Sequence, residues 1–373
     1  MQVGVGFSTA HNPFDAGIYA VHEALQYTEE PNLTFLFCTD NYDQSALFHT
    51  VKNQIGRSML VGACVPGIIS REGVHRQGVG VLTIKGLEIQ AVTALGHITS
   101  DSYNSGFQTG NCLKESGLKD GTIFVFPDGF AANMSHLLRG LYNALGSEFN
   151  YIGGGTGDNL RFHKSYQFWD QGFGSNHIAA ALVKGIDFYA ESGHGWKPIG
   201  EPMVVTKAEG KIVYELDGYP AFDRYSEVLG GIDRESFAEY GMKYPLSIPS
   251  FSGDYLIRDP INVRRDNSIE FVTEVPLNTV VTLMEGSIES LIDTARTVAA
   301  LSAKKAPVIR VGMVFDCISR YLLMGDDFKR EIDGVLGVLP REAAFIGVLT
   351  FGEVFNRLSV PLFYNKTIVV AVG

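Results

Sequence analysis

The sequence has few of the features that mark export, membrane insertion or a metal centre. Only four cysteines occur in 373 residues, none of them in C-x-x-C spacing, and the nine histidines form no H-E-x-x-H pair. No run of about 18 consecutive apolar residues occurs, so no segment is predicted to span a membrane. The first residues, MQVGVGFSTAHN, lack the basic and apolar regions of a signal peptide. We therefore expect a soluble, cytoplasmic protein without disulfides, bound metal or cofactor.

The charge is also one-sided. The formal net charge is −11, and lysines and arginines form no cluster. Because nucleic acids and anionic membrane surfaces both require a basic contact surface, neither is a predicted partner. With 45% hydrophobic residues the chain can bury a large core, and its length predicts two domains, since single cores rarely grow beyond about 250 to 300 residues.

The same order of elements is present three times along the chain. Each copy has a β-rich run, a helical stretch, a second β run and a third β run, and a βαββ unit of this kind predicts mixed sheets covered by helices. Loops at the strand ends are then the place where functional residues are expected to gather. The β runs cover residues 33–40, 58–68 and 79–86 in the first copy, 122–129, 150–159 and 177–185 in the second, and 310–317, 344–354 and 367–373 in the third.

The second half of the chain also contains antiparallel patterns. Residues 203–218 alternate apolar and polar side chains around Glu209-Gly210, which predicts a hairpin, and residues 255–284 predict another pair around Asp266-Asn267. A long helix is expected after Ser287. The fold class predicted is therefore α/β, with α+β character in the second half. Glycine, proline and Trp196 interrupt the pattern between residues 192 and 200, so we predict two tightly packed domains, 1–192 and 193–373, with a ligand cleft between them.

Six segments carry a resemblance to a known family. GVGFST, IGGGTGDN, HGWKPIGEPMVVTKAEGKIVYELDGYPAFDRY, VFDCISR, LTFGEVFN and YNKTIVVAV together resemble the FIST family, the F-box and intracellular signal transduction proteins. The resemblance covers essentially the whole chain, as a FIST N-terminal domain (1–192) followed by a FIST C-terminal domain (193–373). It implies a sensory domain that binds a small molecule, with amino acids as suggested ligands. Because no F-box or kinase is present, a separate signalling protein is the expected partner.

The chain departs from the family pattern around one arginine. Ser319 and Tyr321 flank Arg320 where the family usually has glycines, and Ala343 and Ala344 stand where a glycine is common. Side chains at these positions would fill or reshape a pocket that depends on glycine backbone. The ligand can therefore differ from the usual ligand of the family.

Charged residues in apolar surroundings are the first candidates for ligand binding. Arg258 and Arg320 could each bind a ligand carboxylate in a bidentate manner. The alternative is structural pairing with Asp259, Asp316 or Glu353. Glu353 is isolated in an apolar run, so it needs either a ligand ammonium group or an arginine. Both interpretations remain open for each of these residues.

Cys317 is the candidate nucleophile. It follows Asp316 at the end of a β run, and the charge of Arg320 would favour its thiolate. The alternative is a buried cysteine that packs as a small apolar residue. No general base is identified near it, which makes catalysis the less favoured use.

The glycine-rich segment 153–159 could bind an anion through its backbone N–H groups, or allow strands to approach closely. Asp158 and Asn159 are its candidate ligand contacts.

His194, beside Trp196 at the predicted domain junction, could line a ligand cleft or belong to domain packing. The resulting hypothesis is a small-molecule sensor that uses Arg258, Arg320, Glu353 and Asp158, with a hydrolase or transferase using Cys317 and a protein-interaction scaffold as alternatives.

Overall fold

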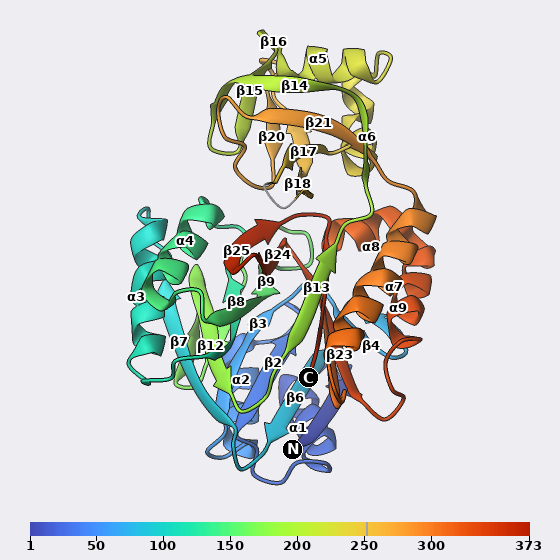
Figure 1. Cartoon of the computed structure of the whole chain (residues 1–373). Helices are drawn as coiled ribbons and strands as arrows, with labels where there is room; N and C mark the ends of the chain where they lie inside the picture. Colours follow the sequence, from blue (N-terminus) through green and yellow to red (C-terminus); the bar gives the residue numbers. More distant parts are fainter. Residues whose placement is uncertain (251–252) are drawn as a thin grey trace.

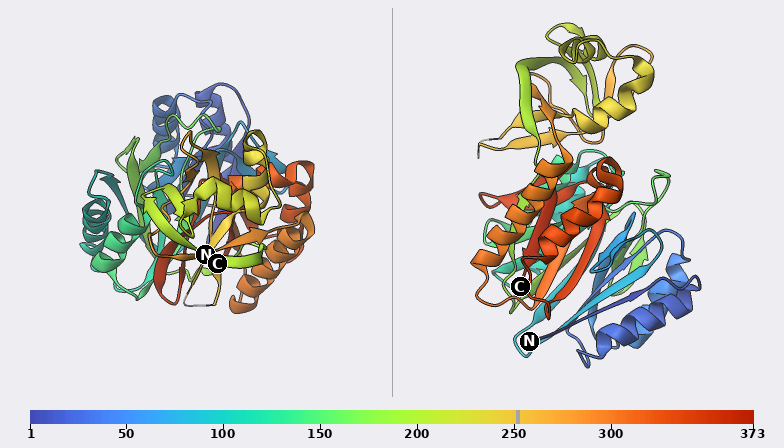
Figure 2. Two further views of the ribbon diagram at one scale, coloured as in Figure 1. Left: turned by 90° about the horizontal axis from the view of Figure 1, so that it is seen from above. Right: turned by 90° about the vertical axis from the view of Figure 1, so that its right-hand side faces the viewer.

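The computed structural model describes residues 1–250 and 253–373 of the chain. Three six-stranded sheets form a body, and a fourth sheet belongs to a separate module above it (Figure 1). The module lies over the middle of the body when seen from above, and a narrow connection joins the two in the side view (Figure 2).

The body consists of three units with the same order of elements. Each unit has an outer strand, a helix, a strand, a second helix and two further strands. Unit 1 contains β1 (Gln2–Ser8), α1 (Pro13–Leu25), β2 (Leu33–Cys38), α2 (Gln44–Gln54), β3 (Met59–Cys64) and β6 (Val79–Lys85). Unit 2 contains β7 (Gln90–His97), α3 (Ser102–Lys114), β8 (Gly121–Pro127), α4 (Met134–Leu145), β9 (Phe149–Gly154) and β12 (His177–Lys184). Unit 3 contains β13 (Tyr189–Gly193), α7 (Ile288–Lys305), β22 (Val311–Cys317), α8 (Ile318–Met324), η2 (Gly325–Asp327), α9 (Phe328–Leu336), β23 (Ala344–Thr350) and β26 (Ile368–Val372).

Strand pairing is the same in each unit. The strands on either side of the second helix are parallel, as in β2–β3, β8–β9 and β22–β23. The last strand is antiparallel to the first of these two, as in β6, β12 and β26. The outer strand then pairs with the last strand at the edge of the sheet. This topology confirms the three βαββ copies and adds one strand and one helix in front of each.

Each unit also contributes a short hairpin to the sheet of another unit. The hairpin of unit 1, β4 (Ile68–Ser70) and β5 (Gly73–His75), pairs with β23 of unit 3. The hairpin of unit 2, β10 (Gln167–Trp169) and β11 (Gly172–Gly174), pairs with β3 of unit 1. The hairpin of unit 3, β24 (Glu353–Arg357) and β25 (Val360–Tyr364), pairs with β9 of unit 2. This cyclic exchange links the two halves of the chain through shared sheets.

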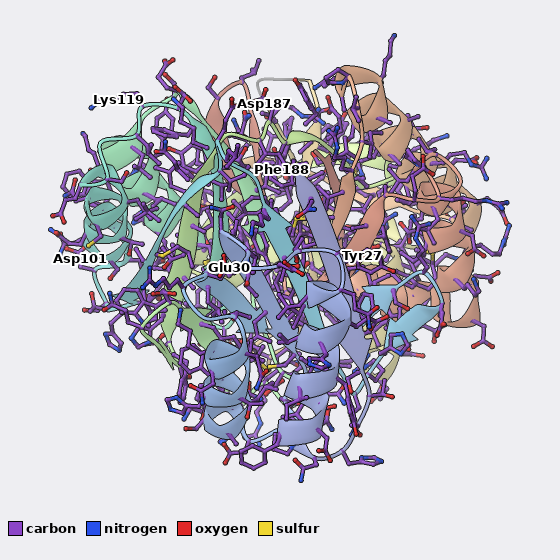
Figure 3. The ribbon with its side chains drawn as sticks, turned by 90° about the horizontal axis from the view of Figure 1, so that it is seen from below. Tyr27, Glu30, Asp101, Lys119, Asp187 and Phe188 are labelled. Carbon is purple, nitrogen blue, oxygen red and sulfur yellow. The ribbon has the colours of Figure 1, made fainter. Side chains whose placement is uncertain are left out.

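The core of the body lies between the three sheets. Side chains alternate along a strand, so Phe37 of β2, Phe126 of β8 and Phe315 of β22 point inward, where their rings are 5.4 Å and 6.0 Å apart. The other face of each sheet packs against its own helices. Figure 3 shows these helix layers on the outside of the body when it is viewed from below.

Local sequence explains where the principal helices begin and end. Asn12 accepts hydrogen bonds from the first turn of α1, which starts at Pro13. Ser287 and Ser290 form a reciprocal cap at the start of α7. Helix α4 ends at Gly146, whose φ of 98° lies in the region that favours glycine.

The inserted module (residues 197–285) lies between β13 and α7 in the chain. It has its own apolar core and an antiparallel sheet, and the hairpins predicted around Glu209-Gly210 and Asp266-Asn267 are both present. The module contains β14 (Lys197–Glu209), β15 (Ile212–Leu216), β16 (Tyr219–Pro220), α5 (Ala221–Val228), η1 (Arg234–Ser236), α6 (Phe237–Lys243), β17 (Leu246–Pro249), β18 (Tyr255–Arg258), β19 (Pro260–Val263), β20 (Ile269–Phe271) and β21 (Val280–Glu285). The predicted fold class, α/β with mixed sheets and α+β character in the second half, is confirmed.

Candidate functional site

A buried ion cluster lies at the end of β22. Arg320, in α8, lies 3.3 Å from the carboxylate of Asp316 and donates a 3.0 Å hydrogen bond from Nε to Glu331 of α9. All three side chains are fully buried. The predicted pairing of Arg320 with Asp316 is present, and Glu331 is a second acidic partner that sequence reasoning did not identify.

Arg320 also joins segments that are distant in the sequence. Its Nη1 donates to the carbonyl oxygens of His194 and Lys366, and its Nη2 donates to that of Leu291 at 3.1 Å. Its guanidinium carbon lies 5.8 Å from the ring centre of Trp196. Every guanidinium nitrogen therefore has a protein acceptor. Through His194 and Trp196, Arg320 also contacts the segment that joins the body to the inserted module.

The cluster holds two carboxylates and one guanidinium. Burial raises the pKa of Asp316 well above its usual value, the charge of Glu331 raises it further, and Arg320 lowers it. Burial also raises the pKa of Glu331, against the opposing effect of Arg320. Because one cation balances only one carboxylate in a dry interior, we expect the pair to retain one proton at neutral pH.

Glu353 begins the hairpin strand β24 and is fully buried. Thr350 lies 2.8 Å from its Oε1, and the backbone N–H of Thr367 donates to its Oε2 at 3.2 Å. The Thr350 hydroxyl also lies 3.1 Å from the carbonyl oxygen of Asp316, to which it can donate its only proton. Burial raises the pKa of Glu353, so the neutral carboxylic acid can donate to Thr350 and complete this chain of hydrogen bonds.

A cavity of about 140 Å³ lies between the inserted module and the body. Its walls are mostly apolar. The module contributes Ala238, Met242, Asp259, Pro260, Ile261 and Val272, and the body contributes Leu160, Phe162, Cys317, Ile318, Ser319, Leu322, Phe351, Gly352 and Asn365. The sequence predicted a ligand cleft between residues 1–192 and 193–373, and this cavity lies instead between the inserted module and the body.

The polar side chains on the cavity wall have partners within the protein. Ser319 donates a 2.6 Å hydrogen bond to Asp259, whose other oxygen lies 3.0 Å from the ammonium group of Lys366. The side-chain oxygen of Asn365 accepts from Thr273 of the module at 2.8 Å. These contacts neutralise the charge on the cavity wall and tie the module to the body.

Cys317 lines the cavity at the start of α8 and is only 3% exposed. Burial raises the pKa of its thiol, and the charges of Glu353 and Asp259 raise it further. The thiol therefore remains protonated at neutral pH, although Arg320 is nearby in sequence. A protonated thiol is a poor nucleophile, and this environment favours a packing role for Cys317.

The other predicted residues lie away from the cavity. Arg258 donates to the backbone carbonyls of Glu274 and Ile257 at 3.0 Å each. Asp158 accepts hydrogen bonds from four backbone N–H groups, those of residues 161 to 164. The backbone N–H of Asn159 donates to Asp40. Of the predicted residues, Asp316, Cys317, Arg320 and Glu353 lie together at the end of β22, and only Cys317 lines the cavity. Arg258, Asp158 and Asn159 do not line it.

His194 lies beside the connection between the body and the module. Its Nδ1 accepts a 2.9 Å hydrogen bond from the backbone N–H of Trp196, which is 3% exposed and packs against side chains of both parts. Burial lowers the pKa of His194 to about 4, with a further contribution from the charge of Arg320. Its imidazole is therefore neutral at pH 7 and acts as an acceptor.

The glycine-rich segment lies where two units meet. A Cβ added to Gly157 would lie 1.9 Å from the ring of Phe351, and one added to Gly155 would lie 2.6 Å from the Phe351 carbonyl oxygen. These glycines allow the hairpin of unit 3 to approach unit 2 closely. This packing supports the second of the two predicted interpretations, close approach of strands.

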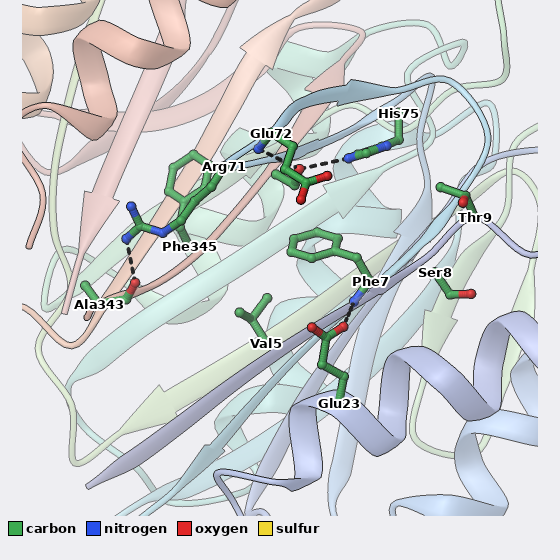
Figure 4. Close-up of a pocket in the computed structure, with 11 residues that line it drawn as sticks. Val5, Phe7, Ser8, Thr9, Glu23, Arg71, Glu72, His75, Ala343 and Phe345 are labelled. Carbon is green, nitrogen blue, oxygen red and sulfur yellow. Dashed lines mark hydrogen bonds between the residues drawn. The ribbon is translucent and has the colours of Figure 1, made fainter. Parts of the chain in front are cut away.

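A larger hollow of about 430 Å³ lies between β1 and the sheet that contains β23 (Figure 4). Two of its charged side chains bond to the backbone: Arg71 donates to the carbonyl of Ala343 at 2.8 Å, and Glu23 accepts from the N–H of Phe7 at 2.8 Å. None of the residues predicted from the sequence lines it. We therefore regard the cavity beneath the module as the candidate site.

Two residues that shape this region, Glu331 and Lys366, were not predicted from the sequence, and Asp259 was named only as a possible partner of the arginines. Glu331 lies on the apolar face of α9 with Phe328, Ile332 and Val335, and a carboxylate at this spacing was a usable signal of burial. Asp259 and Lys366 meet across more than one hundred residues of sequence. No local pattern marks a contact of that kind.

The fold and cavity are those of a two-part α/β protein with a potential ligand site between its parts. The FIST N domain model matches residues 32–219 and the FIST C domain model matches residues 221–356. The chain belongs to the FIST family. FIST domains are associated with sensory roles in signal transduction. The two models meet near residue 220, and the boundary at residues 192 and 193 stays a prediction.

Several relatives share much of the chain. An uncharacterised protein of Methanocaldococcus jannaschii is 27% identical over 357 residues, which cover 87% of this chain and 67% of the relative. One of Mycobacterium tuberculosis is 24% identical and covers 69% of each chain. One of Mycobacterium bovis is 22% identical over 96% of this chain and 95% of its own length. These similarities extend over both parts of the molecule.

Across residues 1–250 and 253–373, none of the helices combines the length and apolar character needed to cross a membrane. Within the same ranges, His, Cys, Asp and Glu side chains form no group of three that could hold a metal ion.

Proposed function

We propose that this protein is a small-molecule-binding sensory protein whose ligand binds in the cavity between the inserted module and the body. The observation that carries this proposal is the composition of the cavity, because both parts contribute its walls. Ligand sites are common at such junctions. A ligand that contacts both parts would stabilise one orientation of the module, which a separate signalling protein could then recognise.

The cavity favours a neutral ligand with an apolar body. Asp259, Ser319 and Asn365 already have partners within the protein. A charged ligand would lose its hydration without gaining a free countercharge, and that loss is costly in an apolar environment. An apolar cavity of about 150 Å³ can hold benzene, so about 140 Å³ suits a molecule, or part of one, of similar size.

A free amino acid fits this cavity less well. It would bring an ammonium group and a carboxylate, for which Glu353 and Arg320 were the predicted partners. Glu353 is bonded to Thr350 and Thr367, and Arg320 is bonded to Glu331. Among amino acids, those with apolar side chains remain the candidates, and we propose neutral apolar metabolites ahead of them.

Thermal unfolding in the presence of a ligand panel tests the proposal. The panel contains amino acids, carboxylates, nucleotides, sugars and small neutral aromatic and aliphatic molecules. A true ligand at 100 times its Kd should stabilise the protein by about 2.7 kcal/mol. We expect the neutral apolar class to do so, and Ala238→Phe, on the exposed wall of α6, to abolish the effect by filling the cavity.

Glu239→Phe is the matched control, because Glu239 is an exposed neighbour on α6 that does not line the cavity. It should leave ligand stabilisation intact. Stabilisation that survives Ala238→Phe, or that occurs only with charged ligands, would show that the ligand binds elsewhere.

A further inference from the structure

Three large apolar side chains surround the cavity and are also exposed to solvent. Phe162 is 60% exposed, Ile261 is 44% exposed and Leu322 is 42% exposed, and each lines the cavity. They come from the β9–β10 loop, the module strand β19 and helix α8, respectively. An apolar surface thus continues from the interior of the cavity to the outside. We call these three residues the apolar rim.

The loop that carries Phe162 has an unusual backbone. Leu160 and Phe162 have φ values of 62° and 53°, in the left-handed region that large side chains rarely adopt. Asp158 holds this conformation by accepting hydrogen bonds from the N–H groups of residues 161 to 164. Such backbone strain persists only where surrounding contacts enforce it, and it is frequent at ligand clamps.

This arrangement fixes the Phe162 ring at the cavity mouth instead of burying it. The ring contacts Phe351, with centres 5.4 Å apart, and Phe130, with centres 5.9 Å apart. Both contacts support one side of the ring and leave more than half of the residue exposed. A strained loop that presents an aromatic ring to solvent is an observation independent of the cavity itself.

From these two observations we propose that the ligand is a neutral chain molecule longer than the cavity. One part of the chain fills the cavity, and the remainder lies against the apolar rim. The ligand class is a straight-chain aliphatic molecule with an uncharged polar end, such as a fatty alcohol. This inference rests on the proposed function, because it assigns the ligand of the same cavity. Asp158 is a positioning residue in this arrangement, since it acts through Phe162.

Calorimetric titration with butanol, hexanol, octanol and decanol, each below its solubility limit, tests the inference. Burial of one methylene group strengthens binding by about fourfold. We expect the Kd to continue to decrease beyond hexanol, where the small cavity alone would be full. Leu322→Ser and Phe162→Ser should each weaken decanol binding by about tenfold or more, and butanol binding by a clearly smaller factor, because both residues also line the cavity.

Leu87→Ser is the matched control, because Leu87 is fully exposed and does not line the cavity. It should change no Kd in the series. A Kd that stops decreasing at hexanol, or decanol binding that is unaffected by both rim variants, would overturn the chain-length inference and leave the proposed function standing. Failure of every alcohol and of every neutral apolar molecule in the thermal panel would overturn both.

Discussion

Glu353 and Gln167 occupy equivalent positions in two units of the body. Each is the first residue of a hairpin, where Gln167 pairs with Ala63 and Glu353 with Gly154. Gln167 donates to Thr156 at 2.7 Å and accepts from the backbone N–H of His177 at 3.0 Å. Glu353 makes the corresponding contacts with Thr350 and with the N–H of Thr367. The side-chain amide of Gln167 in unit 2 therefore makes the same kinds of hydrogen bond as the carboxyl group of Glu353 in unit 3.

This equivalence predicts that Glu353→Gln is tolerated. The amide can donate to Thr350 and accept from Thr367, so the free energy of unfolding should change by less than about 1 kcal/mol near pH 4, where the carboxyl group of Glu353 is largely protonated in both the folded and the unfolded protein. Glu353→Ala leaves buried donors and acceptors unpaired and should cost about 1 to 3 kcal/mol or more. Urea unfolding of the two variants measures the difference. A large loss in Glu353→Gln would mean that the carboxyl group is ionised in the native protein.

The difference in unfolding free energy between the wild type and Glu353→Gln should change with pH in one direction. Because burial raises the pKa of Glu353, the folded protein retains a proton that the unfolded chain has released. The stabilising contribution is complete below the ordinary carboxyl pKa and is lost as the pH increases, by up to about 1.4 kcal/mol per pH unit. The advantage of the wild type over Glu353→Gln should therefore decrease with increasing pH.

Substitution of Arg320 should lower the free energy of unfolding far more than substitution of either of its acidic partners. Arg320→Met leaves Asp316 and Glu331 buried without a cation and should cost about 3 to 5 kcal/mol. Glu331→Gln alone should be mild, because one cation and one carboxylate then remain. The double variant should lose less than the sum of the two single losses, and a double-mutant cycle measures this coupling.

The matched control for Arg320 is Arg330→Met. Arg330 pairs with Glu289 at the surface, with both side chains more than half exposed, and this exposed pair should contribute at most about 1 kcal/mol. Equal losses for the two arginine variants would contradict a special role for the buried cluster.

The sequence predicted the three βαββ copies because each strand and helix is marked by its own local pattern. The outer strands β1, β7 and β13 were not assigned to any copy, and in the third unit the inserted module also separates β13 from α7. The exchanged hairpins were missed for a related reason. Strands β4 and β10 have only three residues each, and nothing in so short a segment indicates that it pairs with a different unit.

In the candidate site, too, contacts between residues close in the sequence could be predicted, and contacts between distant segments could not. Pairing of Arg320 with Asp316 was one of the alternatives considered, because the two residues are four positions apart at a strand-to-helix junction. The contact of Lys366 with Asp259 depends on how the module meets the body, which no spacing indicates. Burial of Glu353 was expected from its apolar neighbours, yet its partners follow from the hairpin register.

His194 predicts a loss of stability under acidic conditions. Its pKa is about 4 in the folded protein, while an unperturbed histidine titrates near 6.5. Between pH 6.5 and pH 4 the histidine is protonated in the unfolded chain but still neutral in the folded protein. The contribution of neutral His194 to stability is therefore complete above pH 6.5 and is lost as the pH decreases to 4. The loss amounts to roughly 3 kcal/mol.

His194→Asn isolates this effect, because its side-chain oxygen can still accept from the N–H of Trp196. The difference in unfolding free energy between wild type and variant should shift by roughly 3 kcal/mol between pH 7 and pH 4, to the disadvantage of the wild type. His177, whose pKa is also lowered by burial, is common to both proteins and cancels in the difference. A difference that is constant with pH would show that His194 titrates normally.

Cys317 should resist alkylation in the native protein. Its thiol is buried and its pKa is raised, whereas Cys112 is exposed on α3. Iodoacetamide at pH 8 should modify Cys112 rapidly, and it should reach Cys317 only when the protein opens, because the thiolate is the reactive form. Mass spectrometry of the native protein measures both rates, and the urea-unfolded chain should show all cysteines modified together. If Cys317 reacted as fast as Cys112 in the native state, its thiol would be accessible and activated. A cysteine enzyme would then be favoured over a sensory protein in which Cys317 only lines the ligand cavity.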